Sequence, residues 1–380
     1  MKSSKSISDI KLHVGINATS LNNRPSGAKS RFLGIYPKLF SALKRAKFII
    51  YHSKDYEIKN DINPMQNVYF KEGPFISDKI LERNIKGLFF WKNEIRSHKF
   101  DIFENLHLPT IRNRYGITIQ TIHDIRHLNG KTLLLNFYKF IYKNSSKYSD
   151  LILTVSEAMK KEIIKKLPNS NVSVIYNGLD ISSHEFGIRN NNEQFDGDYI
   201  LSIGHFEERK NYINLVLAFE KIIQEGFSDN LIIVGNDSGM QKKVFNLINK
   251  LKLSKRVLIF SNVDNDKLAA LYKDAKFFIF PSKYEGFGIP IIEAFNHSCP
   301  VLLSNISVFK EITEERLVYF DPNDISNISS AIKKMLTSED LRIQSIKYGK
   351  ERIQDFDNQR LADKLISEYE KILNQKDKMK

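Results

Sequence analysis

The chain has 380 residues, of which 42% are hydrophobic and 11% aromatic, and this supply of core-forming side chains excludes an intrinsically disordered protein. Cys299 is the only cysteine, which excludes a disulfide scaffold and suits a reducing compartment. No apolar run reaches the ~18 residues of a membrane span and the N-terminal stretch contains no apolar signal segment, so we expect a cytosolic globular protein of two domains.

Positive charge is concentrated in the first half of the chain. The formal net charge is +14, and the whole excess falls within residues 1–190. A domain that is basic on its own favours an anionic partner such as membrane headgroups, a phosphorylated substrate or nucleic acid. A solvated basic surface without a special partner is the alternative.

Short β-rich runs alternate with apolar-periodic stretches along the first half. A glycine loop at 23–30 is expected to lead into the first helix, and Ser156 to cap the last one. The expected strands are 11–19, 47–53, 101–107, 117–124, 151–156 and 172–178, and the expected helices are 32–43, 133–148 and 157–167.

The same alternation restarts after a polar stretch at 181–198. Continuous apolar strands separated by helices predict parallel sheets covered on both faces, and therefore an α/β protein with two doubly wound, Rossmann-like domains. The expected strands are 198–204, 230–237, 257–261, 276–282 and 300–305, and the expected helices are 211–226, 240–251, 266–275 and 289–298. The expected organisation is a first domain at 1–185, a linker at 186–197, a second domain at 198–356 and an amphipathic closing helix at 357–380.

The loop EGFG, after the strand over 276–282, is the densest in candidate site residues. Ligands of open α/β sheets bind outside the carboxyl ends of the strands. Glu285 leaves the strand end, the glycines let a ligand approach the backbone, and Pro290 is expected in the first turn of the next helix. That helix N-terminus suits a phosphate, and Glu293, expected on the first turn, would meet ribose hydroxyls. A purely structural glycine turn is the alternative.

A second loop brings two cations to the same expected sheet edge. After the strand that ends at Gly204, the segment HFEERKN contains Arg209 and Lys210 just before a helix. Two cations beside a helix N-terminus are unfavourable unless an anion joins them. We therefore expect a diphosphate held by Arg209, Lys210 and the amides of 286–288. A solvated Arg–Lys pair is the alternative.

The first half contains two further candidates. His123, in HDIRH, directly follows a strand and would face a cleft between the domains, where it would hydrogen-bond a sugar or a leaving group. A core or capping histidine is the alternative. Gly27, in the loop SGAKS, would admit a ligand to the backbone, with Lys29 and Arg31 adding positive charge.

Together these segments resemble a known family. ILSIGHFEERKN followed by FPSKYEGFGIPIIEAF, with an E-x7-E spacing, is similar to the retaining, nucleotide-sugar-dependent glycosyltransferases of the GT-B fold, most of all glycosyltransferase family 4. SGAKSRF, TIHDIRHL, LTVSEAMKKEI and VSVIYNGLD follow in family order, so the resemblance extends over nearly the whole chain. It implies two Rossmann-like domains facing across a cleft, the first for the acceptor and the second for the nucleotide sugar.

The resemblance also implies a role for each matching residue. Glu285 would contact hydroxyls of the donor sugar, and Glu293 the ribose of the nucleotide. Arg209 and Lys210 would neutralise the diphosphate leaving group, and His123 would lie beside the donor sugar. The remaining donor-binding residues that the motifs imply are Gly27, Gly204, His205, Gly286, Phe287 and Gly288.

The chain departs from the family pattern at one position. Many members have Arg directly after the glycine that ends the first strand of the second domain, where this chain has His205. The form G-x-x-E-x-RKN resembles a subgroup of mannosyltransferases of bacterial surface-polysaccharide assembly, including O-antigen, capsule and lipopolysaccharide, in which Arg209 would serve instead. The resemblance thus implies transfer of a sugar, with GDP-mannose the first choice of donor, to a glycan or lipid-linked acceptor.

No metal or other cofactor is expected. The chain has no Asp-x-Asp cluster placed for a metal, so the cations and a helix dipole would stabilise the leaving group. In a retaining transfer the acceptor hydroxyl attacks from the side on which the phosphate departs, and the phosphate takes its proton. A glycosidase with Glu285 and Glu293 as its two carboxylates would leave Arg209 and Lys210 without a role.

The basic first domain suits a lipid-linked acceptor and a peripheral position on the cytoplasmic face of an anionic membrane. The aromatic and basic segments 86–96 and 137–144 are the candidate contacts, with a core helix as the alternative for the second. A nucleic-acid-binding protein would also be basic, but no recognisable readout module is present, so no nucleic-acid partner is expected. A GT-B scaffold that binds without catalysis is the other alternative.

Overall fold

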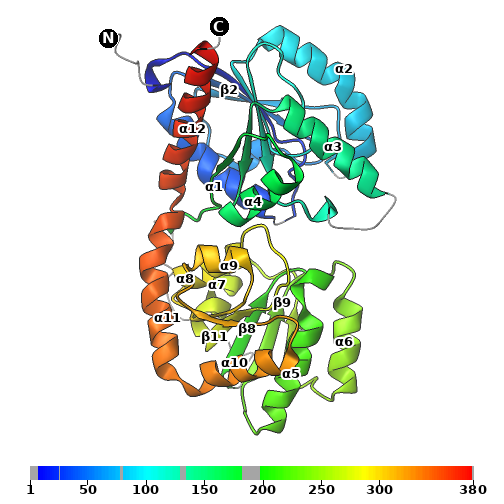
Figure 1. Ribbon diagram of the computed structural model, residues 1–380, viewed down its shortest axis with the longest axis vertical. Coiled ribbons are helices and arrows are strands. Elements are labelled where there is room, and N and C mark those ends of the chain that lie inside the picture. The colour runs from blue at the N-terminus through cyan, green and yellow to red at the C-terminus, as the bar shows by residue number, and fades with distance from the viewer. Residues whose placement is uncertain (1–6, 25, 78–79, 129–133, 182–196, 379–380) are drawn as a thin grey trace. The chain divides into compact units, whose positions relative to one another are not determined.

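The computed structural model describes residues 7–24, 26–77, 80–128, 134–181 and 197–378. The chain divides into two compact units, one formed by Met1–Leu179 with Asp357–Lys380 and the other by Asp180–Phe356 (Figure 1). The linker expected at 186–197 lies, except for Gly197, outside the described residues.

The first unit is built on a parallel sheet with the strand order β3-β2-β1-β4-β5-β6-β7. Every residue of β5 and all but the first of β2 are buried, because helices cover both faces of a parallel sheet. The strands are β1 (His13–Asn17), β2 (Lys47–His52), β3 (Val68–Glu72), β4 (Ile102–Asn105), β5 (Ile117–Ile122), β6 (Leu151–Thr154) and β7 (Val172–Val174).

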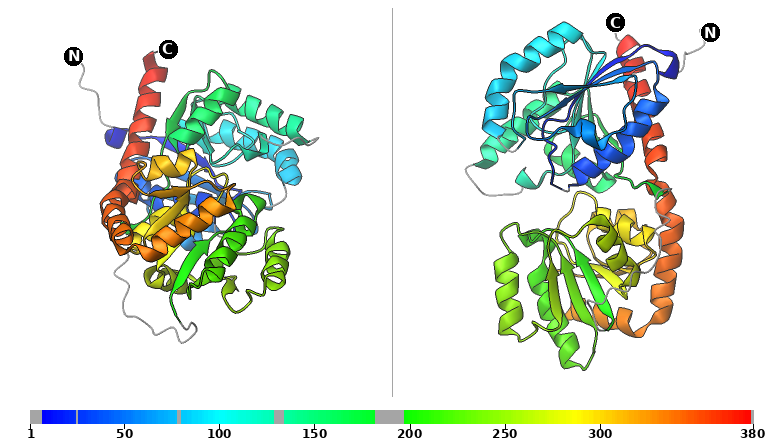
Figure 2. Two further views of the ribbon diagram at one scale, coloured as in Figure 1. Left: turned by 60° about the horizontal axis from the view of Figure 1, so that its bottom comes forward. Right: turned by 180° about the vertical axis from the view of Figure 1, so that it is seen from behind.

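Helices cover the two faces of this sheet. On one face α12 lies against α1, and Leu365 and Tyr369 of α12 share a core with Phe32 of α1 (Figures 1 and 2). On the other face Trp91 of α2 packs against Tyr51 of β2. The helices are α1 (Gly27–Ala42), α2 (Ile80–His98), α3 (Leu134–Tyr148), α4 (Glu157–Lys166) and α12 (Asn358–Lys378).

The start of α1 differs from the expectation. The sequence analysis assigned residues 23–30 to a loop, whereas the helix begins at Gly27. Ser26 explains the earlier start, because its Oγ accepts a hydrogen bond of 3.2 Å from the amide of Lys29 and so caps the helix. Ser156 caps α4 in the same way, as predicted, through a bond of 3.0 Å from the amide of Met159.

The second unit has the same design, with a parallel sheet in the order β10-β9-β8-β11-β12-β13. The strands are β8 (Tyr199–Ile203), β9 (Asn230–Val234), β10 (Val257–Phe260), β11 (Phe277–Phe280), β12 (Val301–Ser304) and β13 (Val318–Phe320). The helices are α5 (Tyr212–Gln224), α6 (Gln241–Lys250), α7 (Asn265–Asp274), α8 (Ile289–Asn296), α9 (Ser307–Ile312), α10 (Ile325–Thr337) and α11 (Glu339–Arg352).

The order of strands in the second sheet positions the candidate site. β8 and β11 are neighbours and run in parallel, so the loop after Ile203 and the loop after Phe280 leave the same edge side by side. In each unit the alternation of parallel strands and helices is the α/β architecture that the sequence predicts. Among the described helices, none combines the length and the hydropathy needed to cross a bilayer.

Candidate functional site

The carboxylate of Glu285 joins the two cations of the RKN segment. Its Oε1 lies 2.7 Å from Nζ of Lys210, and its Oε2 lies 2.6 Å from Nη1 of Arg209. The side chains of Lys210 and Glu285 are only 8% and 11% exposed. Burial alone would raise the pKa of Glu285, but Lys210 and Arg209 together hold that pKa below its ordinary value. Glu285 is therefore an ionised carboxylate between two cations, and we call these three residues the clamp.

Backbone contacts lock the two loops of the clamp together. Arg209 and Lys210 lie in a short 3-10 turn, Glu208–Lys210, after which Asn211 adopts a left-handed conformation with φ of 61°. The side chain of Asn211 donates to the carbonyl of Pro281 at 3.1 Å, and the amide of Lys283 donates to the carbonyl of Arg209 at 2.8 Å. The Asn of RKN thus fixes the cations against the end of β11.

Lys210 is held on its other sides by Gly204 and Phe280. Its Nζ lies 4.6 Å from the centre of the Phe280 ring, a cation–π distance. Gly204 has a φ of 152°, and a Cβ there would lie 2.9 Å from Cε of Lys210, so only glycine leaves room for the lysine. Burial lowers the pKa of Lys210 and outweighs the opposite effect of Glu285.

Arg209 has a second carboxylate partner that the sequence analysis did not single out. Its Nε donates to Oε2 of Glu207 at 2.6 Å, and burial, which lowers the pKa of Arg209, is outweighed by Glu285 and Glu207. The expectation that the two cations need a bound anion is therefore corrected, because carboxylates of the protein already neutralise them. The spacing of Glu207, two residues before Arg209 in one loop, was the available signal.

The glycine turn beside the clamp opens directly into α8. Gly288 is the N-cap residue with a φ of 148°, no side chain caps the helix, and Pro290 lies in the first turn, as predicted. Phe287 is buried, with its ring 5.9 Å from that of Phe356. Uncapped amides at a helix N-terminus suit an anion such as a phosphate.

Glu293 lies on the second turn of α8, not on the first, because the helix begins at Ile289. Its Oε2 accepts a hydrogen bond of 2.9 Å from the hydroxyl of Tyr272 in α7, and burial raises its pKa. The ring of Tyr272 is stacked on His297 at 5.6 Å. Tyr272 was missed because nothing in the local sequence relates it to a residue 21 positions away.

The remaining candidates are spread over both units. His205 follows Gly204 in the second unit, next to the clamp, and is half-buried. His123 follows β5 in the first unit, where burial, assisted by the cation of Arg31, lowers its pKa to about 3, so its imidazole is neutral at physiological pH. Gly27 is the first residue of α1 rather than part of a loop.

Arg31, which was expected to add positive charge beside Gly27, is a buried cation. It is 2% exposed, and its Nη1 donates to the carbonyls of Ile175 and Tyr176 at 2.6 and 2.7 Å. It lies near Glu104 of β4, which accepts hydrogen bonds from the hydroxyls of Tyr36 and Tyr369. Burial raises the pKa of Glu104 in spite of these bonds.

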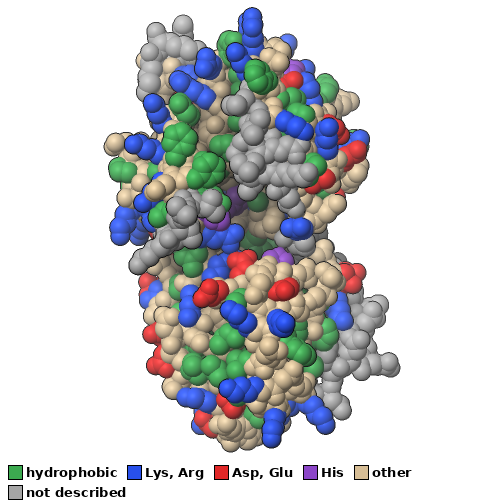
Figure 3. Space-filling model, turned by 90° about the vertical axis from the view of Figure 1, so that its right-hand side faces the viewer, with side chains coloured by type: hydrophobic (Ala, Val, Ile, Leu, Met, Phe, Trp, Pro, Cys, Tyr) green, Lys and Arg blue, Asp and Glu red, His purple; other side chains and the backbone are tan. Residues whose placement is uncertain are grey.

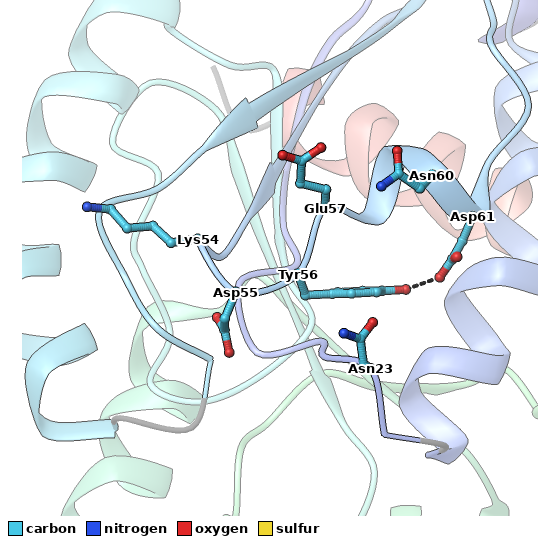
Figure 4. A pocket seen from close by; sticks show the side chains of 7 residues that line it. All are labelled: Asn23, Lys54, Asp55, Tyr56, Glu57, Asn60 and Asp61. Carbon is cyan, nitrogen blue, oxygen red and sulfur yellow. Dashed lines mark hydrogen bonds between the residues drawn. The ribbon is translucent and has the colours of Figure 1, made fainter.

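A polar pocket of about 230 Å³ lies at the carboxyl edge of the first sheet, formed mainly by the segment after β2 (Figure 4). Tyr56 lies in it with its hydroxyl bonded to Asp61, which also pairs with Lys29 at 3.2 Å. The lining side chains are Asn23, Lys54, Asp55, Tyr56, Glu57, Asn60 and Asp61. Hydroxyl-binding side chains around an aromatic ring suit a carbohydrate. Within the described ranges, no three His, Cys, Asp or Glu side chains are grouped to hold a metal ion.

Two family models match the chain, one on each side of residue 184. The model for "Glycosyltransferase Family 4" matches residues 39–183, and the model for "Glycosyl transferases group 1" matches residues 185–352. Between them they include the first-unit residue His123 and all residues of the clamp.

Curated relatives include mannosyltransferases. The O-antigen chain mannosyltransferase RfbU of Salmonella typhimurium is 32% identical over 60% of this chain and 62% of its own length. The serotype-specific mannosyltransferase WbdA of Escherichia coli is 30% identical over 50% of this chain and 26% of its own length. The matches thus span less than two thirds of each of these relatives.

Solved structures share the fold at low sequence identity. A sucrose-phosphate synthase from Thermosynechococcus elongatus superposes with a TM-score of 0.76 at 17% identity, over 96% of this chain and all of the other. WaaG, a glycosyltransferase involved in lipopolysaccharide biosynthesis, superposes with a TM-score of 0.70 at 16% identity, over 93% of this chain and 98% of its own. These neighbours confirm the predicted GT-B class of two Rossmann-like units.

Proposed function

This chain belongs to the family 4, group 1 glycosyltransferases, and on that premise we propose that it transfers a sugar from a nucleotide-sugar donor to a glycan or a lipid-linked acceptor. The mannosyltransferases RfbU and WbdA among its relatives favour mannose as the sugar and GDP-mannose as the donor. The names of these relatives, an O-antigen chain mannosyltransferase and a serotype-specific mannosyltransferase, favour a bacterial surface polysaccharide as the product.

The clamp is the observation on which this proposal depends. Transfer breaks the bond between the anomeric carbon and the diphosphate, and negative charge develops on the departing oxygen. Lys210 and Arg209 are fixed in place by Glu285 before any ligand arrives, so they stabilise that charge without reorganising. The glycine turn that follows Glu285 leads into the N-terminus of α8, which no side chain caps, and the positive end of this helix dipole favours the same diphosphate.

We further propose that the anomeric configuration is retained. The acceptor oxygen forms its bond to the anomeric carbon on the face that the diphosphate leaves, and its proton passes to the departing diphosphate oxygen. No protein nucleophile is required, and Glu285, occupied by two cations, is ill suited to be one. The two cations supply the charge that a metal would otherwise supply.

The acceptor is assigned to the first unit, whose polar pocket offers the carboxylates and amides of its lining side chains to the hydroxyls of a sugar. His123, with a neutral imidazole, is available at the carboxyl end of β5 to accept or donate a hydrogen bond.

An anionic membrane surface is the proposed docking partner of the first unit, on the cytoplasmic face. Phe89 of α2 is 78% exposed and Phe140 of α3 is 63% exposed. α2 connects β3 to β4 and α3 connects β5 to β6, and both connections run in the same direction along the strand order of the sheet. Because such crossovers are right-handed, the two helices lie on the same face of the sheet. Figure 3 shows hydrophobic and basic side chains interspersed over this unit. The exposed lysines of the two helices include Lys86, Lys92, Lys139 and Lys143.

Vesicle sedimentation tests the docking. Wild-type protein should bind vesicles that contain phosphatidylglycerol, and added salt should weaken this binding. The double variant Phe89→Asp with Phe140→Asp should lose it, whereas Phe245→Asp, at a phenylalanine of the second unit that is 54% exposed, should not. Equal binding to neutral phosphatidylcholine vesicles would refute an electrostatic docking surface.

Release of nucleoside diphosphate tests the transferase itself. The protein is incubated with GDP-mannose, UDP-glucose and ADP-glucose together with extracted lipid-linked glycan, and the free GDP, UDP or ADP is measured. Lys210→Ala should reduce release by about 10³-fold, since removal of one group that stabilises the developing charge typically has that effect. Lys273→Ala, an exposed lysine of α7, is the matched control. Tight nucleotide binding without release from any donor would instead support a non-catalytic scaffold.

A further inference from the structure

The second unit contains a cavity at the amino-terminal ends of its strands, whereas the clamp lies at their carboxyl-terminal ends. The cavity has a volume of about 370 Å³, and its walls include Val301 and Val318, the first residues of β12 and β13. Glu285 follows the carboxyl end of β11. Because the strands are parallel, their amino-terminal ends lie on the opposite side of the sheet from Glu285. The cavity is therefore separate from the proposed donor site.

Two cations give this cavity its chemical character. Arg316 and Lys334 both line it, together with the amide of Gln344, and no Asp or Glu side chain does. Neither cation forms an ion pair within the described part of the chain, and the acids next to Arg316 are engaged elsewhere, Glu315 with Lys310 and Glu314 with Arg352.

The guanidinium of Arg316 is also held in position. It lies 4.8 Å from the centre of the Tyr348 ring, which fixes its plane without using its N–H donors. The remaining lining includes Ser345 and Leu341. Two cations in a mainly polar cavity suit a compact molecule with one phosphate and further polar groups, and the volume lies in the range of small-molecule sites, about 300–1,000 Å³.

We propose that this cavity binds a small phosphorylated molecule of the size of a sugar phosphate, and that its occupancy changes the affinity of the donor site for nucleotide. The proposal goes beyond the transferase activity, because it adds a regulatory site that the transfer itself does not use. A phosphate held between Arg316 and Lys334 would form charge-assisted hydrogen bonds to both.

A continuous path of packed side chains joins the cavity to the clamp. Tyr319 lines the cavity and its hydroxyl is bonded to Oγ1 of Thr313, which ends α9. Phe309 of α9 is stacked on Phe280 at 4.8 Å, and Lys210 lies over the ring of Phe280 at 4.6 Å. A ligand that draws β13 or the end of α9 toward the phosphate would displace the rings that support the cation.

The same helix also contacts the glycine turn. A Cβ at Gly288 would meet Phe309 at 3.2 Å and Ile312 at 3.4 Å, so α9 packs directly against the N-cap of α8. Both halves of the proposed diphosphate site, the cation and the amides, thus rest on one short helix. Coupling between two sites needs such an element that both ligands can bias.

Isothermal titration with inorganic phosphate and with glucose 6-phosphate, at constant ionic strength, tests the site. The double variant Arg316→Gln with Lys334→Gln should weaken binding by about tenfold or more, which corresponds to loss of the charge-assisted contacts. Lys347→Gln, an exposed lysine of α11 outside the cavity, should bind as wild type does. Circular dichroism and thermal melts establish that the variants are folded.

Lys210→Ala separates this site from the donor site, since phosphate would also bind to the clamp. Sugar-phosphate binding should persist in Lys210→Ala, and saturating sugar phosphate should change the GDP dissociation constant of the wild type at least threefold but not that of the double variant. Binding that is abolished by Lys210→Ala and retained by the double variant would overturn the proposal. Binding at the cavity without any change in GDP affinity would overturn its regulatory half.

Discussion

Two buried glutamates, one in each unit, have opposite protonation behaviour, and their partners explain why. Glu285 lies between Lys210 and Arg209, and its pKa is lowered although burial opposes this. Glu104 is more deeply buried, with none of its surface exposed, its direct partners are hydroxyl groups that include those of two tyrosines, and its pKa is raised. Hydrogen bonds from neutral groups do not compensate for the loss of water around a charge, whereas two cations in direct contact do. We propose that the first arrangement serves a charged ligand and the second serves the fold.

Of the changes that test this comparison, neutralising Glu285 should have the largest effect on the free energy of unfolding. Glu285→Gln leaves Lys210 and Arg209 without their shared counterion, and breaking a buried ion pair typically costs about 3–5 kcal/mol. We expect the free energy of unfolding, from urea denaturation without nucleotide, to fall by about 3 kcal/mol. GDP should restore much of this loss, because its diphosphate replaces the missing anion.

The same substitution at Glu104 is the matched comparison. Because burial raises the pKa of Glu104, replacing its carboxyl by an amide of the same shape should cost less than at Glu285, and the free energy of unfolding should fall by about 1 kcal/mol, the value of one altered hydrogen bond. An equal loss of stability in Glu104→Gln and Glu285→Gln would contradict the distinction between the two carboxyls.

The pH dependence of unfolding should separate the two residues by sign. The pKa of Glu285 is lowered in the folded state, so its contribution to stability is present above about pH 4.5 and is lost as the pH falls through the folded pKa. The pKa of Glu104 is raised, so its contribution is present below about pH 4.5 and decreases as the pH rises toward the folded pKa.

Urea denaturation between pH 3.5 and about pH 7 measures this difference for wild type and the two glutamine variants. The stability advantage of the wild type over Glu285→Gln should increase with pH, and its advantage over Glu104→Gln should decrease. Parallel pH profiles for the two variants would mean that partners do not set the charge state of these residues.

Tyr272→Phe should have a smaller effect, which is confined to the affinity for the nucleotide. Its hydroxyl fixes one oxygen of Glu293, which is the proposed partner of the ribose. Loss of one hydrogen bond, about 1 kcal/mol, should weaken GDP binding by about fivefold. The variant should also lose its preference for GDP over 2′-deoxy-GDP, and an unchanged preference would show that Tyr272 only fills space.

Substitutions in the polar pocket of the first unit should have the smallest effect on chemistry. Glu57→Gln and Asn60→Ala change two exposed lining side chains, so we expect the acceptor KM to rise about threefold to tenfold while donor hydrolysis without acceptor stays unchanged. Lys44→Ala, an exposed lysine of the same unit that does not line the pocket, is the control. Unaltered acceptor kinetics in both variants would move the acceptor site elsewhere.

The sequence predicts the strand–helix alternation because its strands are continuous apolar runs, which are easily distinguished from the polar loops. It also places Arg209, Lys210 and Glu285 near the carboxyl ends of the strands, since each lies in a loop that follows a strand of the same parallel sheet. The candidate residues of the two loops are neighbours in the structure, as predicted.

Features that depend on distant contacts were out of reach. The sequence does not show that Glu285 bridges both cations or that Tyr272 bonds to Glu293, because each contact depends on side-chain directions set by packing. No element was predicted between β12 and the closing helix, where α9 is a helix of six residues and β13 a strand of three, both too short for a periodic pattern. Arg31 looked like surface charge because only the fold buries it.

The central claim is that the clamp recognises the diphosphate of the donor, and calorimetric titration with GDP and GMP tests it most directly. The wild type should bind GDP far more tightly than GMP, and Lys210→Ala should bind the two nearly equally, because the added phosphate then has no ammonium partner. If Lys210→Ala keeps the full wild-type preference for GDP over GMP, the clamp does not bind the diphosphate and the account of this site is wrong.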